Sequence, residues 1–174
     1  MGDRAAGAGV TGRTVVLEVA RLEAAHLSAL VAQFADLVDG STPAHEDPAL
    51  ARLVPTPYPD DDEAAREFRT LTETDLLTRR RADAEIVLFS LAEAAGIPDD
   101  PDNPALLEQV EIRLEPETVR AWLRTLAAVR LVMAERLDIT RPEDHDPDNP
   151  RFGIYDWLGY RLDGLVASFD DGQA

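Results

Sequence analysis

An arginine in the middle of a helix's apolar face limits how this chain can fold. When residues 73–95 are placed on a helical wheel, leucine, alanine and valine side chains gather on one face, and Arg80 falls inside it. Arg79 and Arg81 flank Arg80 on opposite sides, where both can reach solvent. Because a buried charge without a partner is strongly destabilising, the fold must either bring a carboxylate to Arg80 or let the arginine reach the surface.

Two further charged residues lie on predicted apolar faces. Arg130 falls near the middle of the face formed by a helix over residues 117–137, and Glu23 lies among the leucines of a helix over 20–40. We therefore expect Glu23 to pair with Arg80, with Arg130 or with both, in a buried charge network that is either structural or part of a ligand site. The alternative is that the arginines extend along the surface and meet exposed carboxylates.

The overall pattern predicts a mainly α (α+β) fold, with four principal helices in an orthogonal or bundle-like arrangement and two short β-strands. The strands are expected at 13–19, which is rich in β-branched residues, and at 108–114, where Val110, Ile112 and Leu114 alternate with polar residues. The two strands could pair. Pro116 is expected to open the third long helix, and the last helix is expected at 153–169.

The segment around the arginines is predicted to hold two consecutive helices. A short helix at 63–70 should lead into a longer one, with Thr72 as its N-cap and Asp75 in the capping-box position. Ile86 and Phe89 lie opposite the main apolar face of this longer helix, which indicates neighbouring elements on every side.

Residues 13–170 are expected to form a single helical domain. The prediction places a disordered lead-in at 1–12 and a short tail at 171–174. Five prolines and a run of aspartates predict a long loop at 40–62, with room for one helical turn after Pro48. No apolar run is long enough for a membrane span and the N-terminal residues lack an apolar signal core, so the cytoplasm is the expected compartment.

The composition excludes several classes of mechanism. The chain has 34 acidic and 17 basic residues, a net charge of −17, and it contains neither lysine nor cysteine. Without lysine there is no Schiff base, and without cysteine there is no disulfide, thiolate nucleophile, thiolate metal site or thiol redox switch. The negative charge disfavours direct binding to nucleic acid and to anionic membranes, because both depend on cationic contacts with phosphate.

Motifs for catalysis or metal binding are weak. Glu23 and His26 have the Glu-x-x-His spacing of carboxylate-bridged metal bundles, but the chain has no second copy of this motif. The pentapeptide DPDNP occurs at 100–104 and again at 146–150, where its prolines and missing glycine favour turns over a calcium loop. No nucleophile or general base has an obvious partner. We therefore expect no enzymatic activity, no metal and no cofactor.

Three stretches together resemble a known family. They are REFRTLTETDLLTRRRADAE (66–85), AWLRTLAAVRLVMAERLDIT (121–140) and YDWLGYRLDGLV (155–166). In order and spacing they resemble an actinobacterial domain-of-unknown-function family that includes the AosR oxidative-stress regulators. The resemblance implies a regulatory role, with a protein partner in the transcription machinery or a protease adaptor pathway. Any thiol-based sensing in that family cannot operate in a chain without cysteine.

We therefore expect a cytoplasmic regulatory protein that acts through protein–protein contacts. Two alternatives stay open: a direct DNA-binding regulator that uses the arginine cluster at 79–81, and a helical bundle that binds a metal or small ligand around Glu23, His26, Arg80 and Arg130. The oligomeric state is not indicated. The candidate partner-contact residues are Arg79, Arg81, Trp157 and Tyr160, of which the two aromatic residues lie off the main apolar face of the last helix.

Overall fold

The computed structural model describes residues 13–54 and 60–171. Two strands, β1 (Val15–Ala20) and β2 (Gln109–Leu114), pair antiparallel, with Val15 opposite Leu114 and Ala20 opposite Gln109. The predicted strands are thus both present, each within two residues of its expected limits.

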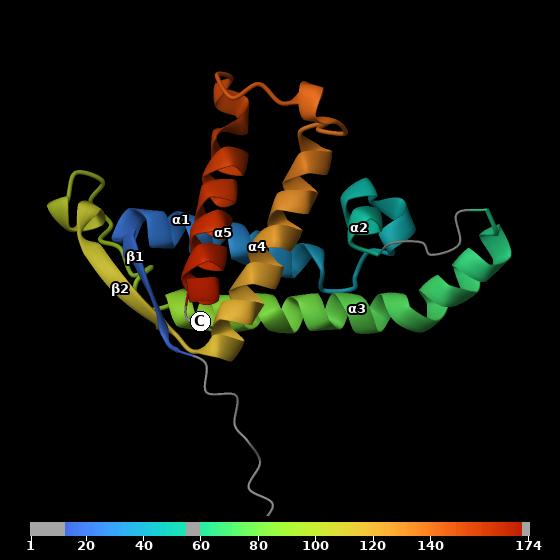
Figure 1. The fold of residues 1–174 in the computed structure, drawn as a ribbon, viewed down its shortest axis with the longest axis horizontal. Coiled ribbons are helices and arrows are strands. Elements are labelled where there is room, and N and C mark those ends of the chain that lie inside the picture. Colours follow the sequence, from blue (N-terminus) through green and yellow to red (C-terminus); the bar gives the residue numbers. More distant parts are fainter. Residues whose placement is uncertain (1–12, 55–59, 172–174) are drawn as a thin grey trace, which may run out of the picture.

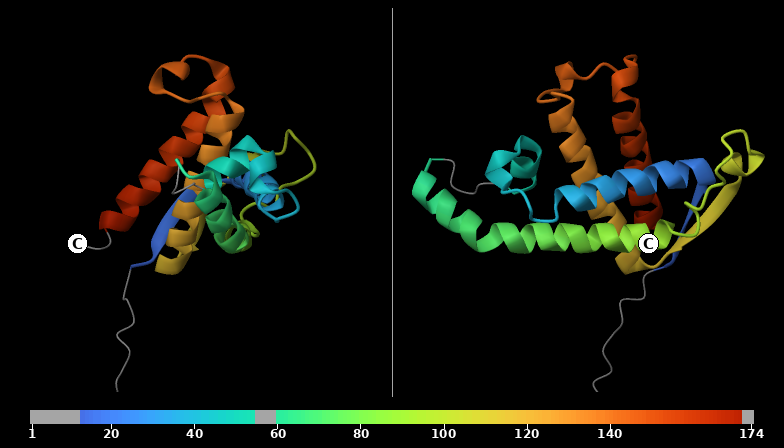
Figure 2. Two further views of the ribbon diagram at one scale, coloured as in Figure 1. Left: turned by 90° about the vertical axis from the view of Figure 1, so that its right-hand side faces the viewer. Right: turned by 180° about the vertical axis from the view of Figure 1, so that it is seen from behind.

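Four long helices make up most of the described part of the chain. Helix α1 (Arg21–Leu37) lies beside α3 (Asp62–Leu91), while α4 (Pro116–Arg136) and α5 (Gly153–Asp171) form an antiparallel hairpin that crosses this pair (Figures 1 and 2). The short α2 (Pro48–Leu53) packs against α4. The prediction of a mainly α fold with four principal helices and two short strands is confirmed, and the crossing corresponds to the orthogonal arrangement.

The core lies where the two helix pairs and the inner face of the sheet meet. Because the apolar faces of α1, α3 and α4 each carry residues spaced three or four apart, all three helices can bury one side against this centre. Trp122 of α4 is 1% exposed, and its indole N–H donates to the Ser90 hydroxyl of α3 at 2.8 Å. The largest fully buried side chains include Val19, Val31, Leu50, Leu53, Leu91, Leu114, Trp122, Leu126, Leu158 and Leu165.

The predicted loop at 40–62 contains a 3₁₀ turn and the helical turn expected after Pro48. A 3₁₀ turn at Ala44–Glu46 precedes α2, and the Asp47 carboxylate caps α2 by accepting from the Ala49 backbone N–H at 2.8 Å. Leu50 and Leu53 of α2 are fully buried. The helical turn expected after Pro48 is therefore present as α2, because two leucines one turn apart provide enough apolar surface to anchor a short helix. Residues 55–59 of the predicted loop lie outside the described residues.

The two helices predicted before and after Thr72 are a single helix, α3. Thr72 is not an N-cap: its hydroxyl donates to the Phe68 carbonyl, one turn back within the same helix, at 2.8 Å. The prediction of neighbours on every side of α3 is also wrong. Ile86 and Phe89 are 43% and 87% exposed, so α3 is covered on one side only.

Both copies of DPDNP form turns that lead into a 3₁₀ helix. The Asp100 carboxylate accepts from the Asp102 N–H, and the Asn103 side chain accepts from the N–H two residues later, at the start of η2 (Pro104–Leu107). Asn149 caps the second turn, at Pro150–Phe152, in the same way. The interpretation of these repeats as turns rather than calcium loops agrees with this geometry.

The lead-in predicted at 1–12 and residues 172–174 of the predicted tail lie outside the described residues, whereas Asp171 ends α5. Across the described residues, no helix combines the length and apolarity that a bilayer span requires.

Candidate functional site

Glu23 does not pair with Arg80 or Arg130, and the predicted network among these three residues is wrong. The Glu23 carboxylate instead accepts from Arg161 Nε at 2.6 Å and from the Trp157 indole N–H at 2.8 Å, both on α5. A second guanidinium nitrogen of Arg161 completes the ion pair. The wheel placed Glu23 correctly toward the interior, but the partner came from the last helix.

Local structure explains why this cluster forms. Trp157 and Arg161 are four residues apart on α5, so their side chains lie on the same face. Glu23 occupies the first turn of α1, where the partial positive charge of the helix terminus favours a carboxylate, and it accepts from the Ala20 N–H at 3.4 Å. The side chains of Glu23 and Arg161 are 19% and 22% exposed. The cluster therefore joins the start of α1 to the middle of α5 in a largely desolvated setting.

Arg80 lies under the C-terminal end of α2. One guanidinium nitrogen donates to the Leu53 carbonyl at 3.2 Å, while its buried Nε has no hydrogen-bond acceptor among the described residues. Burial lowers the pKa of Arg80, and the nearby Asp83 carboxylate opposes this effect. Arg80 thus stabilises the end of a short helix, where a cation interacts favourably with unpaired carbonyls.

Arg130 lies between α4 and α5. Its guanidinium stacks on the Tyr155 ring at 4.1 Å from the ring centroid, and its Nε donates to the Tyr155 carbonyl at 3.4 Å. Gly159 makes room for this arrangement, because a Cβ at that position would lie 3.2 Å from two nitrogens of the guanidinium. Arg130 is half-buried without a carboxylate partner among the described residues, and its guanidinium packs between α4 and α5 against Tyr155 and Gly159.

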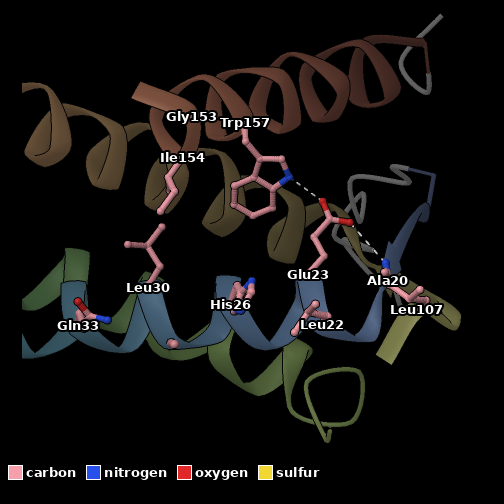
Figure 3. A pocket seen from close by; sticks show the side chains of 11 residues that line it. Ala20, Leu22, Glu23, His26, Leu30, Gln33, Leu107, Gly153, Ile154 and Trp157 are labelled. Atoms are coloured by element: carbon pink, nitrogen blue, oxygen red, sulfur yellow. Dashed lines mark hydrogen bonds between the residues drawn. The ribbon is translucent and has the colours of Figure 1, made fainter. Parts of the chain in front are cut away.

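An apolar groove lies beside the Glu23 cluster (Figure 3). It has a volume of 680 Å³ and runs between one face of α1 and the first turns of α5. Trp157 and Ile154 form one wall, Leu22 and Leu30 the other, and Leu107 of η2 closes one end. Leu107 is 72% exposed and Ile154 58% exposed, so the groove is rimmed by apolar side chains that face solvent.

The four residues predicted to contact a partner have different environments. Trp157 is half-buried at the groove, and Tyr160 is 72% exposed on the same helix. Arg79 and Arg81 are both exposed on α3, where Arg81 pairs with Glu85 at 3.1 Å. The structure therefore brings one predicted contact residue, Trp157, together with Glu23, and leaves the arginines elsewhere.

The Glu-x-x-His motif does not gather ligands for a metal. His26 lines the groove and is exposed, whereas the carboxylate of Glu23 points to Trp157 and Arg161. Among the described residues, no group of three or more histidine and carboxylate side chains lies close enough to hold a metal ion.

Sequence reasoning missed three residues of this site. Arg161 carried a signal, since it lies one turn after Trp157 and could have been considered as the partner of Glu23. Leu107 carried none, because it falls next to a proline-containing turn, where helical periodicity gives no information about the exposed face. Ile154 lies at the start of the helix predicted at 153–169 but was not identified as a site residue.

Comparison with known proteins identifies relatives. The family model described as "Domain of unknown function (DUF2017)" matches residues 4–169. The chain is 28% identical over 145 residues to "Putative oxidative stress regulator AosR" of Mycobacterium leprae (strain TN), a match that covers 73% of this chain and 60% of that protein. No solved structure matches. The resemblance found in the sequence is therefore confirmed, and the chain belongs to the DUF2017 family, which includes AosR.

Proposed function

We propose that this protein is a non-enzymatic, cytoplasmic regulator that binds another protein through the groove between α1 and α5. The observation that carries the proposal is the pair of exposed apolar residues, Leu107 and Ile154, at the rim of a groove whose walls are also apolar. Exposed apolar surface of this kind is typical of protein-binding sites. The relative named as an oxidative stress regulator supports a regulatory role.

The partner segment should be apolar and flanked by basic residues. Apolar side chains would fill the groove, while arginine or lysine would be attracted to a chain with a net charge of −17. We propose a partner in the transcription machinery or a protease adaptor pathway. Because the chain has no cysteine, signalling would depend on binding and not on thiol oxidation.

The geometry gives less support to direct DNA binding. Of the three consecutive arginines, Arg80 is half-buried and bonded to the Leu53 carbonyl, and Arg81 is paired with Glu85. Only part of the predicted basic cluster is thus available for phosphate. A small apolar ligand is the second candidate, because a 680 Å³ groove lies in the range of about 300–1,000 Å³ typical of ligand sites.

Affinity capture with groove variants tests the proposal. Tagged wild-type protein, Leu107→Asp and Leu71→Asp would be incubated with nuclease-treated lysate of the source organism, and bound proteins quantified by mass spectrometry. Leu71 is the matched control, because it is 71% exposed, against 72% for Leu107, and lies on α3 away from the groove. We expect a specific protein to be retained by wild type and by Leu71→Asp and lost with Leu107→Asp.

The captured protein would then be purified and its affinity measured directly. Removing a leucine that becomes buried on binding costs about 1.5–3 kcal/mol, so Leu107→Asp should weaken binding at least tenfold. Equal retention by both variants would show that the groove is not the binding surface. Recovery that requires intact nucleic acid would favour the DNA-binding alternative.

A further inference from the structure

The two edges of the β-sheet differ. In an antiparallel pair, alternate residues direct their N–H and C=O groups to the partner strand and the others direct theirs away. The Arg21 N–H donates to the Glu108 carbonyl at 3.0 Å, and this bond shows which residues direct their backbone groups to the partner strand. The backbone N–H and C=O groups of Glu18 and Ala20 of β1 therefore point away from β2. The C-terminal part of this edge is occupied: the Glu18 carbonyl accepts from Arg161 at 3.3 Å, and the Ala20 N–H donates to Glu23.

The outer edge of β2 is open. By the same alternation, the backbone N–H and C=O groups of Gln109, Glu111 and Arg113 point away from β1. None of these groups forms a hydrogen bond with another described residue. β2 lies on the outer side of the sheet in Figure 1 and in the right-hand view of Figure 2, and the helix nearest to this edge is α3, whose C-terminal turns line a groove with β2. Unpaired strand edges are templates for pairing with another strand.

The charges along this edge are self-complementary. Glu111 and Arg113 are exposed, 55% and 73% by side chain, and form an ion pair at 3.3 Å along the strand. If a second copy of β2 pairs antiparallel across a twofold axis at Ile112, Glu111 of each copy lies opposite Arg113 of the other. We propose that the protein forms a homodimer through β2, in which the two sheets join into one four-stranded antiparallel sheet.

The same charges select this register. Only Gln109, Glu111 and Arg113 direct backbone N–H and C=O groups to the open edge, so in a dimer these residues of one copy must lie opposite the same set in the other. The two neighbouring registers that meet this condition place the twofold axis at Glu111 or at Arg113. The first places two glutamates opposite each other, and the second places two arginines opposite each other. Like charges directly opposite on adjacent strands are destabilising. The register centred on Ile112 combines paired backbone groups with two attractive cross-strand pairs.

Space and apolar surface are available beside this edge. A groove of 600 Å³ lies between β2 and the C-terminal turns of α3, and Phe89, at 87% exposed, forms part of its wall. Because a perpendicular twofold axis keeps the inner faces of both sheets on the same side, Phe89 of each copy would lie near the junction. The opposing effect is repulsion between two chains of net charge −17, which salt at about 0.15 M screens beyond roughly 8 Å.

Sedimentation velocity and light scattering of the full-length chain, at about 1–300 µM and 0.15 M salt, test the proposal. Wild type should shift with concentration from the 19.1 kDa of one chain towards twice that mass. Glu111→Arg and Arg113→Glu should each weaken dimerisation by roughly tenfold or more, because each creates two like-charge pairs across the junction. The double variant E111R/R113E should restore the dimer, because it recreates both attractive pairs with their signs exchanged.

The controls separate this surface from general charge effects. Glu143→Arg makes the same charge change as Glu111→Arg at an exposed site in the segment between α4 and α5, and it should leave dimerisation unchanged. Circular dichroism would confirm that each variant is folded. A wild-type chain that is monomeric at every concentration would overturn the proposal, and so would a dimer that neither single reversal weakens or that the double variant fails to restore.

Discussion

Replacing Glu23 with alanine tests whether the link between α1 and α5 stabilises the fold. The substitution removes the acceptor for the Trp157 indole N–H at 2.8 Å and the ion-pair partner of Arg161. It leaves both α5 side chains in place without a carboxylate between them. The expected cost can be worked out from how exposed these groups are.

The Glu23–Arg161 ion pair is neither fully exposed nor fully buried. Fully exposed pairs contribute about 0–1 kcal/mol, whereas breaking a buried pair costs about 3–5 kcal/mol. At 19% and 22% exposure, the Glu23–Arg161 pair should contribute about 1–2 kcal/mol, because water can still reach the guanidinium once the carboxylate is gone. The half-buried Trp157 N–H adds about 1 kcal/mol when its acceptor is lost. We therefore expect Glu23→Ala to lower the free energy of unfolding by about 2–3 kcal/mol.

Urea unfolding followed by circular dichroism would measure this change. With a slope of about 2–3 kcal/mol per molar urea, the unfolding midpoint should fall by about 1 M. A double-mutant cycle with Arg161→Ala then isolates the pair: the two single losses should exceed the loss in the double variant by about 1–2 kcal/mol. Glu18→Ala is the control, since its exposed side chain should change stability by less than about 0.5 kcal/mol.

A loss below about 1 kcal/mol for Glu23→Ala would refute the reasoning, because it would place Glu23 among exposed surface pairs. A coupling energy near zero would refute it differently. It would mean that Arg161 does not interact with Glu23 in solution and that only the indole hydrogen bond and local helix effects matter.

Two further predictions concern α5 and the segment before it. Gly164→Ala should raise the free energy of unfolding by about 0.5–1 kcal/mol, because alanine favours the helix and nothing lies within 4 Å of the new Cβ. Gly159→Ala should give no gain or a loss, because its Cβ would crowd Arg130. Thermal unfolding of both variants checks this, and Gly159→Ala should become stabilising in an Arg130→Ala background. Hydrogen bonds from the Thr140 side chain and backbone hold the pKa of Asp144 below its usual 3.8. This carboxylate therefore stabilises the fold above that pH, and the stabilisation is lost as the pH falls through the folded-state pKa. Asp144→Asn should reduce the loss of stability at acid pH, and a curve of stability against pH identical to that of the wild type would contradict this prediction.

The sequence was sufficient to predict most of the elements because they have clear local signals. Pro116 opens α4 as expected, and the alternation of Val110, Ile112 and Leu114 identified β2. The errors occurred where local chemistry competed with tertiary packing. Thr72 looks like an N-cap, but the helix continues through it, and its hydroxyl donates to the Phe68 carbonyl one turn back instead of capping a new helix.

The charged residues show a different limit. The helical wheels placed Glu23, Arg80 and Arg130 on the faces of their helices that point into the protein, and all three residues are half-buried. Their partners could not be predicted, because an arginine can be satisfied by a backbone carbonyl or an aromatic ring as well as by a carboxylate. Arg80 uses the Leu53 carbonyl and Arg130 the Tyr155 ring, and neither type of partner leaves a pattern in the sequence.

The cluster of Glu23, Trp157 and Arg161 contacts both the groove and the β1 edge of the sheet, but it is not part of the proposed dimer interface at β2. Its carboxylate and Arg161 occupy backbone groups of Ala20 and Glu18, so α5 covers the C-terminal part of that edge of the sheet. Trp157, held by the same carboxylate, forms a wall of the groove. The remaining open edge belongs to β2, and no residue lines both the groove and the cavity beside β2. Partner binding and dimerisation should therefore be separable: Leu107→Asp should leave the dimer intact, and Glu111→Arg should leave the groove competent.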